Sequence, residues 1–114
     1  MTVVGPPAVN VVLSTAPSRE VGETIGRRLV EEELAACVNV VPGVTSIYRW
    51  EGEVQAESEV MLVIKVTQVG TERLLERLEE VHPYDVPEGV VLSVTAGLEA
   101  YCRWVAAEIS EVTS

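Results

Sequence analysis

The chain has 114 residues, of which 47% are hydrophobic, and this size fits one domain with one ordinary core. Its 18 acidic and 8 basic residues give a net charge of −10, which disfavours nucleic acid as a partner because that affinity rests on basic side chains neutralising phosphates. No stretch is apolar for long enough to span a membrane and the N-terminus lacks a signal-peptide pattern, so we expect no membrane partner and a cytoplasmic location.

Three residue types that carry chemistry occur only once, as Lys65, His82 and Asp85. A cage of several histidines and a pair of catalytic aspartates are therefore excluded within one chain. His82 and Glu88 could serve acid–base catalysis, but no serine or cysteine has a recognisable base and no glycine-rich phosphate loop follows a strand. We predict that the chain is not an enzyme.

The first part of the chain predicts a strand and a helix. Residues 1–7 contain Gly5-Pro6-Pro7 and predict a flexible N-terminal tail before a single domain over residues 8–114. Val9–Ser14 is a nearly continuous apolar run, as in a strand covered on both faces. Ser18 is a plausible N-cap for a helix that extends to about residue 34. Gly22 and Gly26 lie beside its apolar stripe and suggest close packing on the sheet.

The central segment, residues 37–67, predicts a long β-hairpin. Residues 37–50 and 54–67 are rich in β-branched and aromatic residues, with the turn at residues 51–53. At ~3.3 Å per residue an arm of about 14 residues spans on the order of 45 Å, whereas a domain of this length has a radius of gyration of only ~13 Å. The arms therefore overrun a globular core, and their apolar outer ends predict burial against other copies of the chain in a symmetric oligomer.

Pro42-Gly43 interrupts the first arm of this hairpin and leaves two interpretations open. The pair makes a bend or bulge within one long strand, or it divides the arm into two short strands that fold back on the domain.

The rest of the chain predicts a helix, a loop, a strand and a last helix. The second helix begins at Gly70-Thr71 and ends at His82-Pro83, since proline disfavours helix at the preceding residue. Residues 84–89 form a loop, residues 90–94 a strand, and a helix follows Gly97. The order β-α-β-β-α-β plus one helix predicts an α+β, ferredoxin-like sandwich with an extra C-terminal helix.

Stretches along nearly the whole chain resemble the CutA family of divalent-cation-tolerance proteins. The matching stretches are Ser14-Thr-Ala-Pro17, Leu34-Ala-Ala-Cys-Val-Asn39, Pro42-Gly-Val-Thr-Ser-Ile-Tyr48, Trp50-Glu-Gly52, Ile64-Lys65 and His82-Pro-Tyr-Asp-Val-Pro-Glu88. The resemblance implies a ferredoxin-like subunit in a homotrimer, an architecture similar to that of the PII signalling trimers, and an association with tolerance of copper and other divalent cations.

The resemblance also implies candidate metal ligands. The family's proposed copper positions fall on Ser14, Val81 and His82, of which only His82 is a good ligand, and Cys37 matches another family cysteine. His82 and Cys37 are the metal candidates, with copper or another divalent cation as ligand and no cofactor required. A buried thiol at Cys37, and weak cation binding by surface carboxylates, are the alternatives.

A cleft between subunits is the second candidate site. Lys65 lies in an apolar strand, where a charge needs a partner, and we expect Glu59, Glu88 or a neighbouring chain's carboxylate. The candidate cleft residues are Tyr48, Trp50, Glu59, Lys65, Tyr84 and Glu88.

Two functions follow from these candidate sites. The first is a CutA-like homotrimer that serves divalent-cation tolerance. The alternative is a PII-like sensor or scaffold that binds a small ligand or partner protein at these clefts, with a small anion beside Lys65. A structural salt bridge at the trimer seam is the plainer explanation of this lysine.

Overall fold

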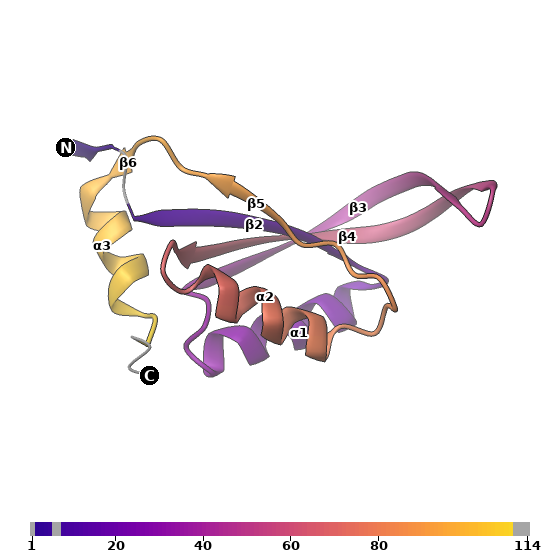
Figure 1. Ribbon diagram of the computed structural model, residues 1–114, viewed down its shortest axis with the longest axis horizontal. Helices are drawn as coiled ribbons and strands as arrows, with labels where there is room; N and C mark the ends of the chain where they lie inside the picture. The colour runs from indigo at the N-terminus through magenta and orange to yellow at the C-terminus, as the bar shows by residue number, and fades with distance from the viewer. Residues whose placement is uncertain (1, 6–7, 111–114) are drawn as a thin grey trace.

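The structure, a computed structural model, describes residues 2–5 and 8–110 and shows a four-stranded antiparallel sheet with two helices on one face (Figure 1). The strand order β3-β4-β2-β5 confirms the predicted ferredoxin-like topology. The elements are β1 (Val3–Val4), β2 (Val9–Ala16), α1 (Arg19–Glu31), β3 (Cys37–Trp50), β4 (Glu53–Thr67), α2 (Thr71–Val81), β5 (Val90–Ser93), β6 (Gly97–Leu98) and α3 (Glu99–Ala107).

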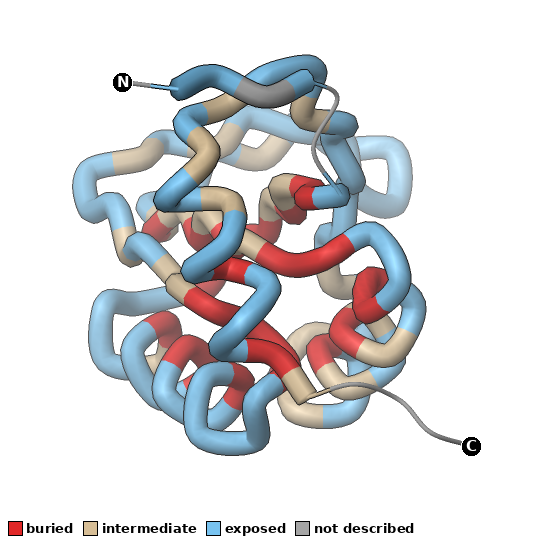
Figure 2. The backbone as a smooth tube through the Cα atoms, turned by 90° about the vertical axis from the view of Figure 1, so that its left-hand side faces the viewer, coloured by how far each residue is buried: buried red, intermediate tan, exposed pale blue. Residues whose placement is uncertain are grey.

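The core lies between the sheet and the helices α1 and α2. Alternate residues of each strand point to opposite faces, so the even-numbered residues of β4 from Val60 to Val66 face the helices and are buried. Figure 2 shows the buried backbone gathered in the centre and lower part of the molecule, whereas the outer turns of the helices are exposed. The largest fully buried side chains are Leu29, Leu62, Ile64, Leu74 and Leu78.

Helix α1 packs closely on the sheet through its glycines, as predicted. A Cβ at Gly22 would lie 3.0 Å from a methyl of Val60, and one at Gly26 would lie 3.2 Å from a methyl of Val38. Ser18 caps the helix by accepting a hydrogen bond from the N–H of Val21 at 3.2 Å. The helix ends at Glu31, a few residues before the predicted end.

The hairpin of β3 and β4 is continuous and extends beyond the helices (Figure 1). Its ladder runs from Cys37↔Lys65 to Trp50↔Glu53 and shifts register once, between Val41 and Val44. Pro42-Gly43 therefore makes a bulge within one strand, and the alternative of two short strands that fold back is wrong. The molecule is 46 Å long, which agrees with the length expected for the hairpin.

Part of the predicted flexible tail is ordered. Val3–Val4 forms β1, which pairs with Gly97–Leu98. Residues 1 and 6–7 of that tail, and residues 111–114 of the predicted domain, lie outside the described residues. A two-residue strand carries no periodic pattern, and its partner lies more than ninety positions away, so local sequence could not reveal it.

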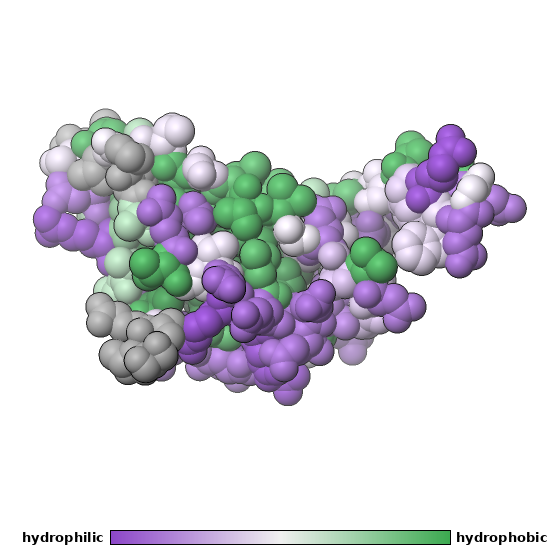
Figure 3. Space-filling view, viewed as in Figure 1, coloured by the Kyte–Doolittle hydropathy of each residue, from purple (hydrophilic) through white to green (hydrophobic). Residues whose placement is uncertain are grey.

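The sheet face opposite α1 and α2, which we call the open face, is largely apolar. Because paired residues share a face, the strand register places Cys37, Lys65, Val11 and Leu92 in one row across it. A second row contains Asn39, Val63, Leu13 and Val90. Figure 3 shows apolar side chains gathered above the polar outer surface of the helices, at the edge formed by β5.

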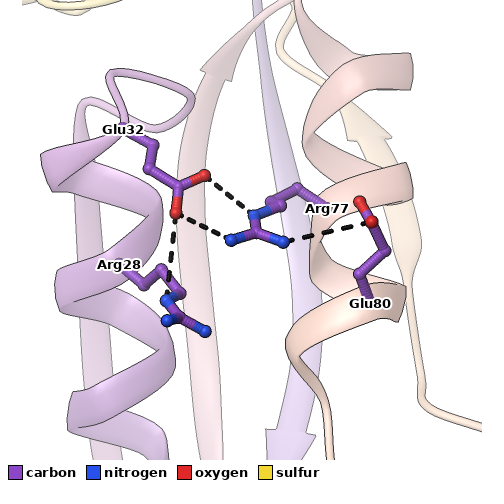
Figure 4. A network of polar contacts seen from close by, with 4 residues as sticks. All are labelled: Arg28, Glu32, Arg77 and Glu80. Carbon is purple, nitrogen blue, oxygen red and sulfur yellow. Dashed lines mark hydrogen bonds and ion pairs between the residues drawn. The ribbon is translucent and has the colours of Figure 1, made fainter.

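A salt bridge joins the two helices on their outer side (Figure 4). Arg77 of α2 donates from Nε to Oε1 of Glu32 at 2.8 Å and from Nη2 to Oε2 at 3.0 Å. Arg28 and Glu80 lie 3.9 and 4.0 Å from the same pair. This bidentate hydrogen bond with Arg77 lowers the pKa of Glu32 below its ordinary value of 4.5.

This pKa shift predicts a pH-dependent effect of Glu32→Gln. A carboxyl whose pKa falls on folding stabilises the fold above its unfolded pKa, and that stabilisation is lost as pH falls through the folded value. We expect Glu32→Gln to lower the thermal midpoint near neutral pH, and the difference from wild type to shrink as pH falls below the ordinary glutamate pKa of about 4.3 and to vanish once the folded carboxyl is protonated. Thermal unfolding followed by circular dichroism across pH checks this. Glu80→Gln should have a smaller effect, because the carboxylate of Glu80 lies 4.0 Å from the guanidinium of Arg77. A deficit for Glu32→Gln that persists at low pH would contradict the electrostatic origin.

Candidate functional site

A cleft of about 960 Å³ lies between the outer part of the hairpin and the loop that joins α2 to β5. Five of the six residues predicted for a cleft line it, namely Tyr48, Trp50, Glu59, Tyr84 and Glu88. The other lining residues are Thr15, Ser46, Ile47, Gln55, Glu57, Pro83, Asp85 and Val86.

The bulge in β3 decides which side chains enter this cleft. Before it, the odd-numbered residues of β3 share a face with the odd-numbered residues of β4, as in Val41↔Met61. After the bulge, the even-numbered residues of β3 share a face with the odd-numbered residues of β4, as in Tyr48↔Gln55. The one-residue shift therefore places Tyr48 on the same face as Glu57 and Glu59. Sequence reasoning missed Glu57, although its spacing of two from Glu59 on a strand is the signal that could have found it.

The cleft is acidic. Four carboxylates line it, from Glu57, Glu59, Asp85 and Glu88, and none of the described residues in its wall is basic. The phenol of Tyr84 donates a hydrogen bond to Oε2 of Glu59 at 2.6 Å. The phenol of Tyr48 donates to Oε1 of Glu57 at 3.1 Å.

Burial and these carboxylates shift three pKa values in the cleft. Burial, followed by the hydrogen bond to Glu59, raises the pKa of Tyr84 well above its ordinary value. Burial and the contact with Glu57 also raise the pKa of Tyr48. The pKa of Glu88 is raised by burial and by the nearby negative charge of Glu59. The cleft thus holds unneutralised negative charge, which a cation would relieve.

Lys65 does not line this cleft within the chain, and its place in a cleft between subunits stays a prediction. It stands in the middle of the open face, and its Nζ donates to Oδ1 of Asn39 on the neighbouring strand. The predicted pairing with Glu59 or Glu88 is therefore wrong within the chain. The reason is distance along β4, because Lys65 is six residues, on the order of 20 Å, from Glu59.

His82 is held by both of its ring nitrogens. The side chain is only 7% exposed, and its Nδ1 accepts a hydrogen bond from the N–H of Tyr84 at 3.1 Å. The proton of the neutral ring is therefore on Nε2, which donates to the carbonyl of Thr15 at 2.7 Å. Neither nitrogen keeps a free lone pair for a metal. In this geometry His82 ties the cleft loop to the end of β2.

Cys37 lies apart from His82. It is a partly buried free thiol in the row of Lys65, whereas His82 contacts Thr15, four residues along β2 from Val11 in that row. Four residues of strand correspond to about 13 Å. Among residues 2–5 and 8–110, no three histidine, cysteine, aspartate or glutamate side chains are grouped as metal ligands.

The other two positions implied for copper supply no ligand either. Ser14 is fully buried in the helix-facing core, and Val81 packs against that core from the end of α2. The described geometry therefore supports an acidic cleft and does not assemble an imidazole–thiolate centre.

The fold and the cleft together define a class of protein, a small ferredoxin-like subunit with an overlong hairpin and an acidic cleft beside it. A sequence model of the CutA1 divalent ion tolerance protein matches residues 10–108, and the chain belongs to this family. None of the described helices is long and apolar enough to cross a membrane.

Individual relatives agree with this family assignment. The chain is 53% identical to the divalent-cation tolerance protein CutA of Thermus thermophilus over 83% of its own length and 92% of the relative's. It is 47% identical to the chloroplastic protein CutA of Arabidopsis thaliana, again over 83% of its length, but it spans only 52% of that protein. The crystal structure of CutA from Xylella fastidiosa superposes with a TM-score of 0.88 at 40% identity, covering 90% of this chain and 99% of that one.

The raised pKa of Glu88 predicts that its ionisation costs stability. A carboxyl whose pKa rises on folding favours the fold below its unfolded pKa, and this contribution is lost as pH rises through the folded value. We expect Glu88→Gln to raise the thermal midpoint near neutral pH and to have no effect below about pH 4. Glu53→Gln, an exposed glutamate of the hairpin that does not line the cleft, is the control and should change little. A lower midpoint for Glu88→Gln near neutral pH would contradict this reasoning.

Proposed function

We propose that this chain serves divalent-cation tolerance by binding divalent cations weakly on the carboxylates of the acidic cleft. The observation that carries the proposal is the cleft itself, which four carboxylates line without a basic residue in the described wall. Its membership of the CutA1 family and the names of its relatives supply the biological context. The chain is proposed to act as a binding protein without catalysis.

The proposal places the cation on oxygen ligands and not on His82 or Cys37. Both nitrogens of His82 already make hydrogen bonds, and releasing one would leave the Thr15 carbonyl or the Tyr84 N–H without a partner. Oxygen ligands suit hard cations, and a site with incomplete protein coordination binds them weakly. Copper remains one of the cations to test.

The same proposal includes a homotrimer in the cytoplasm. Support for assembly comes from the open face, whose two rows are mostly apolar and whose β5 edge is exposed. Leu92 in this face is 46% exposed, and Val90 is 50% exposed. Burial of such a surface against other copies would stabilise a subunit of this size.

The cleft disfavours the PII-like alternative. A sensor of that type was expected to hold a small anion beside Lys65, but the lysine lies elsewhere and carboxylates line the cleft. An anion would meet repulsion there.

Metal titration tests the proposed site. We expect Ca²⁺ and Cu²⁺ to bind with dissociation constants on the order of 10⁻⁴–10⁻³ M, as at weak oxygen-ligand sites. Glu57→Gln and Glu59→Gln should weaken binding, while Glu31→Gln, which removes the same charge on α1 outside the cleft, should not. Calorimetry and chemical-shift mapping measure both. Micromolar copper binding that His82→Ala abolishes in a folded variant would overturn the carboxylate assignment.

Light scattering tests the assembly. We expect a mass three times the 12.3 kDa of one chain. Leu92→Glu should reduce that mass because it places a charge in the open face, while Val69→Glu, at a turn residue that is 88% exposed, should leave it unchanged. A wild-type protein that remains monomeric at micromolar concentration would refute the trimer.

A further inference from the structure

Aromatic rings share the cleft with its carboxylates. Tyr48 and Trp50 extend from β3, and Tyr84 extends from the loop on the opposite wall. An ammonium or guanidinium group gains from carboxylates by charge-assisted hydrogen bonds and from ring faces by cation–π attraction. A small hydrated metal ion uses mainly the carboxylates. The wall thus combines two features that favour an organic cation.

Hydrogen bonds fix the carboxylates that such a cation would meet. Tyr84 engages only Oε2 of Glu59, and Tyr48 engages only Oε1 of Glu57, so each group keeps one oxygen without a partner among the described residues. The two glutamates are two residues apart on β4 and therefore point to the same side, about 7 Å apart. Oriented acceptors at this spacing suit a head group with several N–H donors.

A third acceptor lies at the base of the cleft. Thr15 lines the cleft although its residue is only 7% exposed, and its hydroxyl makes no hydrogen bond within the described part of the chain. Its carbonyl is already held by His82. A hydroxyl at a cleft wall can accept a hydrogen bond from a cationic N–H donor.

The size of the cleft also fits an organic ligand. Its volume of about 960 Å³ falls in the range of small-molecule sites, and no three side chains of the described residues form a metal cage. A single metal ion would leave most of this volume and the rings unused.

We propose that the cleft binds a small organic cation with a guanidinium or primary ammonium head group. The head group pairs with Glu57 and Glu59, donates to the Thr15 hydroxyl and stacks on the ring of Trp50. This inference rests on the proposed function in one respect, since both use the same carboxylates. It goes beyond that function in naming a class of ligand other than a metal.

Butylguanidinium and its neutral isostere butylurea test the inference on the wild-type protein at low salt. By calorimetry and chemical-shift mapping we expect the cation to bind at least about tenfold more tightly than the urea, with shifts at the cleft residues. Trp50→Leu should weaken binding about fivefold through the lost cation–π contact, and Glu57→Gln about tenfold. Equal affinity for the cation and the urea would overturn the inference.

Matched controls separate the cleft from the general acidic surface. Glu31→Gln and Trp104→Leu change an exposed glutamate of α1 and a tryptophan of α3, both outside the cleft, and should leave butylguanidinium binding unchanged. Light scattering checks that each variant keeps the wild-type mass, and Glu59→Gln supplies a second cleft variant that leaves Trp50 in place. Losses of equal size in the control variants would overturn the site.

The outcome also distinguishes this inference from the proposed function. Weak metal binding without butylguanidinium binding refutes only the organic-cation site. Butylguanidinium binding without metal binding refutes only the proposed metal site. N-acetylarginine amide is a further ligand to test, because a guanidinium head group can belong to a free small molecule or to a protein side chain. Tighter binding of the amide than of butylguanidinium supports the site and assigns it to a protein partner, and weaker binding supports it and assigns a free small molecule.

Discussion

The one-residue bulge at Pro42-Gly43 is the constraint on which the outer half of the molecule depends. Between Val41 and Val44 the pairing of β3 with β4 shifts by one residue, and every later side chain of β3 changes face. The glycine adopts φ +80, a conformation that favours glycine, while proline has no N–H to contribute to the ladder. Tyr48 joins the carboxylates of β4 because of this shift.

The cleft and the open face are parts of the same sheet surface. The odd-numbered residues of β4 run from Glu57 at the cleft to Lys65 on the open face, and polarity falls between them at Met61 and Val63. His82 links the cleft to the core, since its ring joins the loop before β5 to the carbonyl of Thr15. A movement of this loop would therefore displace the end of β2. A subunit interface on the open face would lie next to the cleft.

Much of this arrangement could be predicted because it follows local periodicity. The buried stripe of α1, the long hairpin and five cleft residues all follow from residue spacing and from stretches that resemble a known family. The partner of Lys65 could not be predicted, because Asn39 lies on the other arm of the hairpin and only the strand register brings it beside the lysine. The hydrogen bonds of His82 were equally hidden, since a histidine before a proline can be a ligand or a buried tie. Only the position of the Thr15 carbonyl decides between these roles.

The chemistry of the cleft follows from which charges are absent as well as from which are present. Lys65 is the sole lysine, and its engagement with Asn39 on the open face leaves the carboxylates around Glu59 without a cation from the described wall. Tyrosines donate to two of these carboxylates and hold them in place, but a neutral phenol does not cancel their charge. Burial and then the nearby charge of Glu59 raise the pKa of Glu88, and a cation that enters the cleft would relieve the repulsion between these carboxylates. Charge alone therefore admits both metal and organic cations, and the rings of Trp50 and Tyr84 are what would select between them.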